Sequence, residues 1–158
     1  MPEEILAMIH ASRPRRAFGV VVLAGLGMLM LYIGLTFPVD NLLWRLFLLV
    51  FGAVVLWFAN KMWQATSAVI ELTEAELRTS DGVVIARVDQ IRSLDRGTFA
   101  FKPSNGFILR LSDKAPRTWH PGLWWRMGRR VGVGGVTSAA QTKAVAEIIA
   151  AMIAQRQE

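Results

Sequence analysis

Cysteine is absent from this sequence of 158 residues, and histidine occurs only twice. Disulfides, thiolate metal sites and cysteine nucleophiles are therefore excluded, and the lack of cysteine fits a reducing compartment. His10 and His120 lie on opposite sides of a long apolar segment and lack the close spacing of paired metal ligands. We therefore expect no enzyme and no metal cofactor.

The glycine-rich residues 132–137 also lack the features of a nucleotide-binding loop. They have neither the last glycine of a dinucleotide fingerprint nor the GK[ST] ending of a phosphate loop. They also lie too close to the C-terminus to leave room for a βαβ unit. Glycines here would more simply let a strand bend or approach the following helix. We expect no nucleotide cofactor.

Acidic residues are scarce in the second half of the chain. The whole chain has 18 Lys and Arg against 12 Asp and Glu, and residues 114–146 contain basic side chains but no acid. One side of this part is therefore expected to be strongly positive.

Charge is missing altogether from residues 18–37. At roughly 1.5 Å of rise per residue, a helix of this length crosses the ~30 Å hydrocarbon core of a bilayer. A second apolar run, residues 46–59, follows Pro38 and becomes long enough if residues 42–44 join it and Arg45 extends its guanidinium to the headgroups. We predict a two-helix transmembrane hairpin over residues 17–60.

Two alternatives for these runs are disfavoured. A cleavable signal peptide would need a positive start, but Glu3 and Glu4 occupy that region and no cleavage site follows. Burial in a soluble protein would leave a polar face, and neither run has one.

Basic residues flank the hairpin on one side. Arg13, Arg15 and Arg16 precede the first run and Lys61 follows the second, whereas the loop between them holds only Arg45 beside an acid. By the positive-inside rule, both termini are expected in the cytoplasm, with residues 1–16 as a cytoplasmic N-terminal segment.

From Ser67 onward, short β-prone runs replace the apolar helices, after a linker of about six residues, 61–66. Turns are expected at residues 80–82 and 103–106. The expected strands cover residues 68–73, 76–80, 83–88, 91–95, 98–102, 107–112 and 129–136.

The chain ends in a predicted helix over residues 138–155. Ser138 and Gln141 have the spacing of a capping box. An apolar stripe on one face would cover the open end of the protein's own sheet, or alternatively enter a partner's groove. The stripe consists of Val145, Ile148, Ile149, Met152 and Ile153.

The run IELTEAEL at residues 70–77, followed by Asp81-Gly82 and by VDQI at residues 88–91, resembles the PH-like (pleckstrin-homology-like) domains that follow transmembrane helices in small bacterial membrane proteins. The resemblance covers about residues 65–156. It implies an α+β soluble domain over residues 66–156, built as a PH-like β-sandwich or barrel of about seven strands with a C-terminal capping helix. It also implies a non-enzymatic scaffold on the cytoplasmic side of the bacterial inner membrane, although fold alone does not assign function.

Phosphoinositide recognition is not carried over from this family. Its phosphoinositide-binding members use Lys and Arg around the first β-hairpin loop, and we expect that loop at residues 79–82, which contain Asp81 and no basic residue.

Residues 117–135 combine four arginines, three tryptophans and five glycines without an acid. Tryptophan and arginine together suit a membrane interface, and they also suit single-stranded nucleic acid. Because a tethered domain meets lipid at high effective concentration, we favour a lipid-facing surface over nucleic acid. Core packing of the tryptophans and a protein partner remain open. The candidate residues are Arg117, Trp119, Trp124, Trp125, Arg126, Arg129 and Arg130. His120, between Trp119 and Pro121, is expected at the interface or in a turn.

We therefore predict a membrane-tethered binding or assembly module. The alternative is an accessory subunit of a larger membrane complex, whose hairpin packs against partner helices or a second copy of the chain. Gly25 and Gly27 would permit close helix contact in the first span.

Overall fold

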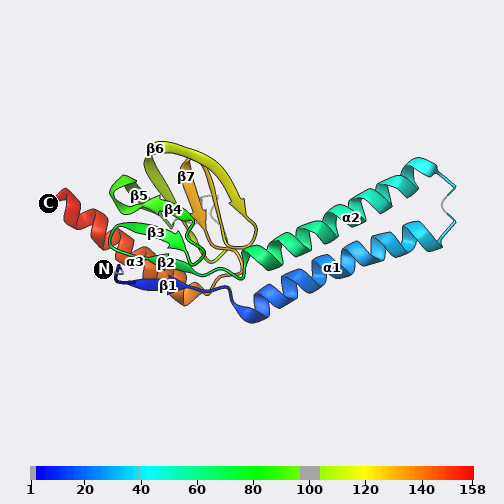
Figure 1. Cartoon of the computed structure of the whole chain (residues 1–158), viewed down its shortest axis with the longest axis horizontal. Coiled ribbons are helices and arrows are strands. Elements are labelled where there is room, and N and C mark those ends of the chain that lie inside the picture. Colours follow the sequence, from blue (N-terminus) through cyan, green and yellow to red (C-terminus); the bar gives the residue numbers. More distant parts are fainter. Residues whose placement is uncertain (1–2, 39, 97–103) are drawn as a thin grey trace.

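The computed structural model describes residues 3–38, 40–96 and 104–158. Two long helices project from one end of a part built from two antiparallel sheets and a third helix (Figure 1). The expected combination of an apolar helical hairpin with an α+β part is therefore present. The strand expected at residues 98–102 lies outside the described residues.

The hairpin consists of α1 (Arg13–Thr36) and α2 (Leu42–Ala65). Each helix has 24 residues and a mean hydropathy of 2.3 in its most apolar window, which is long and apolar enough to cross a membrane. Only 11% of this window in α1 and 22% in α2 is buried within the protein. Packing inside the fold therefore does not account for most of their apolar surface.

Small residues bring the two helices together. A Cβ atom on Gly27 would lie 3.0 Å from the carbonyl oxygen of Gly52 and 2.8 Å from Cγ of Leu56. The helix backbones thus approach closely at Gly27 and Gly52, as small residues allow. Gly25 faces away from α2, and nothing lies within 4 Å of the Cβ it would carry, so it takes no part in the contact between these two helices.

These two glycines offer a matched pair of substitutions. We expect Gly27→Ala to destabilise the hairpin by about 1–3 kcal/mol, because the added methyl group has no space between the helices. Gly25→Ala should cause no loss, since its methyl group enters open space. Thermal unfolding of the full chain in a neutral detergent would measure both, and equal melting temperatures for the two variants would contradict this packing.

The far end of the hairpin is closed by Arg45, whose Nε donates to the carbonyl oxygen of Gly34 at 2.9 Å. This bond satisfies one of the carbonyls that the last turn of α1 leaves free. Asn41 caps the start of α2 by accepting from the backbone N–H of Leu43 at 3.0 Å. Arg45 therefore joins the two helices in addition to any contact with headgroups.

The expected six-residue linker after the hairpin is wrong. Residues 61–65 continue α2, which ends at Ala65 and is capped by Thr66, whose buried hydroxyl donates to the carbonyl of Met62 at 2.6 Å. The apolar helix therefore enters the sheet region directly, without a flexible segment.

In the part of the chain that the structure describes, seven strands form two antiparallel sheets. The first sheet has the order β1 (Ala7–Ile9), β2 (Ile70–Leu72), β3 (Glu76–Thr79) and β4 (Val84–Arg87). A 3-10 turn, η1 (Val88–Gln90), leads to the second sheet, which has the order β5 (Ile91–Asp95), β6 (Phe107–His120) and β7 (Trp124–Val133).

The strand β1 comes from the N-terminal segment, before the helical hairpin. It pairs with β2 so that Ile9 lies opposite Ile70, and the side chain of Ile9 is completely buried. Residues 1–16 therefore do not stand apart from the sheets, and the hairpin is inserted between β1 and β2. For the same reason, residues 79–82, which were expected to form the first loop between strands, instead join β3 to β4. The first connection between strands, from β1 to β2, is the helical hairpin α1–α2.

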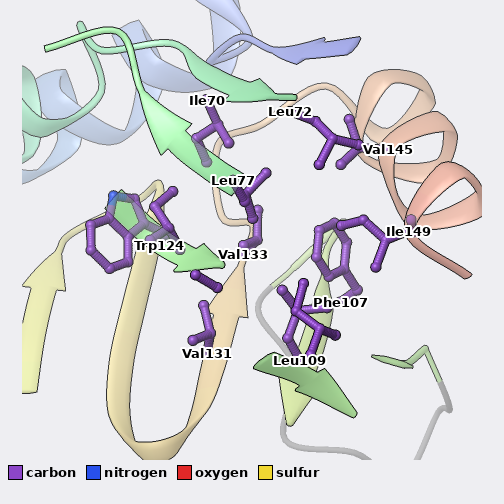
Figure 2. Packing of buried hydrophobic residues seen from close by; sticks show 14 of the residues in the cluster. Ile70, Leu72, Leu77, Phe107, Leu109, Trp124, Val131, Val133, Val145 and Ile149 are labelled. Carbon is purple, nitrogen blue, oxygen red and sulfur yellow. The ribbon is translucent and has the colours of Figure 1, made fainter. Parts of the chain in front are cut away.

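The third helix, α3 (Ala139–Gln157), covers the sheets as its apolar stripe predicted. Val145 and Ile149 are fully buried beside Leu72 and Phe107 (Figure 2). The capping box is wrong, because the side chain of Ser138 makes no capping bond. The other expected capping residue is used elsewhere: Gln141 Oε1 accepts from the backbone N–H of His10 at 2.8 Å. The N-terminal segment is thus tied to α3 as well as to β2.

Candidate basic and aromatic surface

The arginine- and tryptophan-rich residues form the outer half of the β6–β7 hairpin. The sequence ended this strand at Ser112, but β6 continues to His120, which pairs with Trp124 across a short turn. Both strands are bent, with register shifts in β6 around Ala115 and a positive φ of 61° at Gly128 in β7. Figure 1 shows β6 curving over the sheets and ending beside the base of α2.

The tip of this hairpin contacts the end of the apolar helix α2. The ring of Trp119 lies 5.3 Å from the ring of Phe58, measured between centroids. In the turn, Gly122 has a φ of 80°, and a Cβ there would lie 3.1 Å from Cγ2 of Thr66. Glycine is therefore suited to this turn both by its φ and by its contact with the helix end.

Trp124 does not belong to this surface. Its side chain is 1% exposed and lies in the core (Figure 2). It is stacked on the ring of His120, with 4.8 Å between the ring centroids. We therefore remove Trp124 from the candidate binding residues. The sequence left open whether the tryptophans pack in the core, and Trp124 does so.

Arg126 is held by backbone and hydroxyl oxygens. Its Nη1 donates to the carbonyls of Val84 and Ile85 in β4, both at 3.0 Å, and its Nε donates to the carbonyl of Pro116 at 2.8 Å. Nη2 donates to the hydroxyl of Thr118 at 3.3 Å. The guanidinium therefore joins the β6–β7 hairpin to the edge of the first sheet, and these four bonds use most of its five N–H donors.

A hollow of about 340 Å³ opens on the bent hairpin. Trp119 is 56% exposed and Met127 51% exposed at its rim. Trp125 is partly buried because its indole lies against the backbone at Gly132, where a Cβ atom would collide with the ring. The hollow is lined by Arg117, Thr118, Trp119, Trp125, Arg126 and Met127. Four of the seven candidate residues thus meet at one place.

Arg129 and Arg130 are exposed but do not line the hollow. They lie beyond the bend of β7, where Arg130 pairs with Arg110 of β6. The sequence grouped all four arginines by proximity along the chain, whereas the bend separates these two from Arg117.

Cations and tryptophans also gather where the helices meet the sheets. The guanidinium of Arg16 lies 3.8 Å above the ring of Trp63 and donates to its backbone carbonyl at 2.8 Å. Lys61 lies over the ring of Trp57 at 5.8 Å. We call Arg16, Trp57, Lys61 and Trp63 the basal belt. The sequence reading missed it as a site, although tryptophans beside cations at a span end are its usual signal.

His120, at the hairpin tip, has a displaced pKa. Burial lowers the pKa of its imidazole below the ordinary value of 6.5; the charge of Asp81 opposes this shift and that of Lys61 adds to it. The neutral ring is therefore the form that packs on Trp124.

This shift gives a pH-dependent stability. The contribution of neutral His120 should be fully present above about pH 6.5 and should be lost as the pH falls towards the lower pKa of the folded state, because the unfolded chain then binds the proton more readily. When melting temperatures are compared from pH 8 to pH 5, that of the wild type should fall relative to that of His120→Gln only below about pH 6.5. Parallel profiles would show that His120 does not couple protonation to folding.

Within the described residues, no three His, Asp or Glu side chains come together as metal ligands. Comparison with protein-family models, with curated proteins and with solved structures finds no match. The function is therefore argued from the geometry of the basic and aromatic surface.

Proposed function

We propose that this chain is a membrane-tethered, non-enzymatic binding module of the bacterial inner membrane, in which the outer β6–β7 hairpin lies against the cytoplasmic leaflet. The contact between Trp119 and Phe58 carries the proposal. Phe58 lies at the end of the apolar run of α2, beside the basal belt. A half-exposed tryptophan at this level meets headgroups if α2 crosses the bilayer.

The charges at the start of α1 support the same placement. Arg13, Arg15 and Arg16 occupy the first turn of the helix, which contains no acid. Cations oppose the helix dipole there, at a cost of roughly 0.3–1 kcal/mol each. A negatively charged leaflet would offset this cost, at about 1 kcal/mol per basic residue near the surface.

The insertion of the helical hairpin between β1 and β2 constrains its topology. Because β1 pairs with β2, the N-terminal segment and the sheets lie at the same end of the helices. A hairpin that spans the membrane therefore keeps both on one side, and the flanking cations favour the cytoplasm.

The strand order supports a PH-like domain. Within the described residues, six strands after the helical hairpin and one before it form two antiparallel sheets, and one covering helix follows, which is close to the order that the resemblance implies. The departure is that one strand precedes the transmembrane hairpin. Such a scaffold carries binding surfaces without a catalytic centre, which suits a module for binding or assembly.

The depth of the hairpin tip tests this placement, and the lack of native cysteine makes the measurement simple. A spin label on Met127→Cys in the full chain, reconstituted in vesicles with anionic lipid, should report headgroup depth from its accessibility to oxygen and to a water-soluble nickel complex. A label on Glu147→Cys, on an exposed face of α3, is the control and should be in water. A water environment for both labels would refute the lipid-facing hairpin.

A second candidate function, accessory subunit of a membrane complex, is favoured by one observation. Trp44, Phe47 and Phe51 stack along an exposed face of α2, with centroid distances of 5.1 and 5.3 Å. Stacked aromatic rings could pack against a partner helix as well as against lipid. Co-purification of the same membrane protein in mild detergent, lost on Phe47→Ala and Phe51→Ala, would favour this function.

A further inference from the structure

We infer that the hollow on the β6–β7 hairpin binds the phosphate of a single anionic phospholipid, with Arg117 as its ligand. The inference rests on the proposed placement of this hairpin at the leaflet and names what the surface binds. It requires a free cation, a site of suitable size and a path for the acyl chains.

Among the described residues that line the hollow, Arg117 is the cation whose side chain has no partner in this part of the chain. Two guanidinium groups line it, but that of Arg126 is taken up by four oxygen acceptors of the protein. Arg117 is exposed and has no ion pair or hydrogen bond from its side chain among residues 3–38, 40–96 and 104–158. Its planar group can donate two parallel hydrogen bonds to a phosphate.

The size and walls of the hollow favour a headgroup. Ligand sites usually measure about 300–1,000 Å³, so that a hollow of about 340 Å³ suits a phosphate with its glycerol rather than a whole lipid. Trp119 and Trp125 are paired directly across the two strands. Trp125 is fixed against Gly132, whereas Trp119 is exposed and can adjust to the bound group.

The position of the hollow favours a lipid over a water-soluble phosphate. Trp119, in its wall, touches Phe58, which lies on the partly exposed apolar surface of α2. Acyl chains leaving the hollow at this point can follow that surface, so that headgroup and chains bind together. A soluble phosphate would gain only the contact with Arg117.

The test uses the full chain in a neutral detergent, titrated with short-chain phosphatidylglycerol or phosphatidylcholine of equal chain length. Bound lipid is counted by native mass spectrometry. We expect the wild type to prefer phosphatidylglycerol and Arg117→Gln to lose about tenfold in affinity for it, as for one charged hydrogen-bonded contact. The double variant Arg129→Gln, Arg130→Gln removes two exposed cations outside the hollow and should lose less than about threefold.

Three results would overturn the inference in different ways. Equal losses in Arg117→Gln and in the double variant would leave a diffuse basic surface without a headgroup site. Equal binding of both lipids by the wild type, with Met127 at headgroup depth, would keep the membrane placement and refute the phosphate site. Displacement of phosphatidylglycerol by an equal concentration of glycerol 3-phosphate would assign the hollow to a water-soluble phosphate.

Discussion

A fragment that begins at Thr66 and contains every residue after the hairpin is expected to remain unfolded. It lacks β1, so the backbone groups of β2 that pair with β1 have no partner strand. The core also has a cavity in place of the side chain of Ile9. Loss of one large buried aliphatic side chain alone costs about 2–5 kcal/mol, against a total stability of about 5–15 kcal/mol. The fragment also loses the bond between His10 and Gln141 and the bridge between Ala11 and Thr137.

A peptide of residues 3–12, added to this fragment, is expected to restore the fold. Far-ultraviolet circular dichroism and amide dispersion in NMR should recover saturably with peptide concentration. The same peptide with Ile9→Asp is the matched control and should have no effect, because it would bury a carboxylate in the core. Cooperative melting of the fragment without peptide would show that β1 is dispensable.

The second large effect is expected for Ile149→Asp in the full chain. Ile149 is completely buried between α3 and the sheets, close to Phe107 (Figure 2). An unpaired carboxylate there costs several kcal/mol, which removes much of the stability of the sheet part. Near-ultraviolet circular dichroism should show the loss of fixed tertiary packing around the aromatic side chains.

The matched control for this variant lies on the same helix. Ala144 is exposed on α3, so that Ala144→Asp adds the same charge without burying it and should melt close to the wild type. If Ile149→Asp also melted like the wild type, the apolar stripe of α3 would serve a partner and not the protein's own core.

The sequence predicted the helical hairpin because a long run without charge is a strong local signal. It could not predict β1, since three residues are too few to show alternation and their partner strand lies beyond both long helices. The continuation of β6 past Ser112 was missed because Asp113 and Lys114 interrupt the apolar pattern, although both are exposed in the bent strand.

The candidate surface was found by composition, but the role of each residue was not. Trp124 and Trp125 are neighbours in one strand and so point to opposite faces, but the sequence does not show which face is the core; the structure buries Trp124. Arg126 looks like its neighbouring arginines in sequence. Its contacts with the carbonyls of β4 depend on the bend of the hairpin, which no local pattern encodes.

The central claim is that α1 and α2 cross the membrane and hold the N-terminal strand and the sheets together on the cytoplasmic side. Single cysteines at Glu4, Asp40 and Glu158 test it, because the chain has no other cysteine and all three positions are exposed. A membrane-impermeant maleimide added to intact spheroplasts should label only Asp40→Cys, with Glu4→Cys and Glu158→Cys labelled after lysis. Labelling of Glu4→Cys or Glu158→Cys in intact spheroplasts, or of Asp40→Cys only after lysis, would contradict the claim.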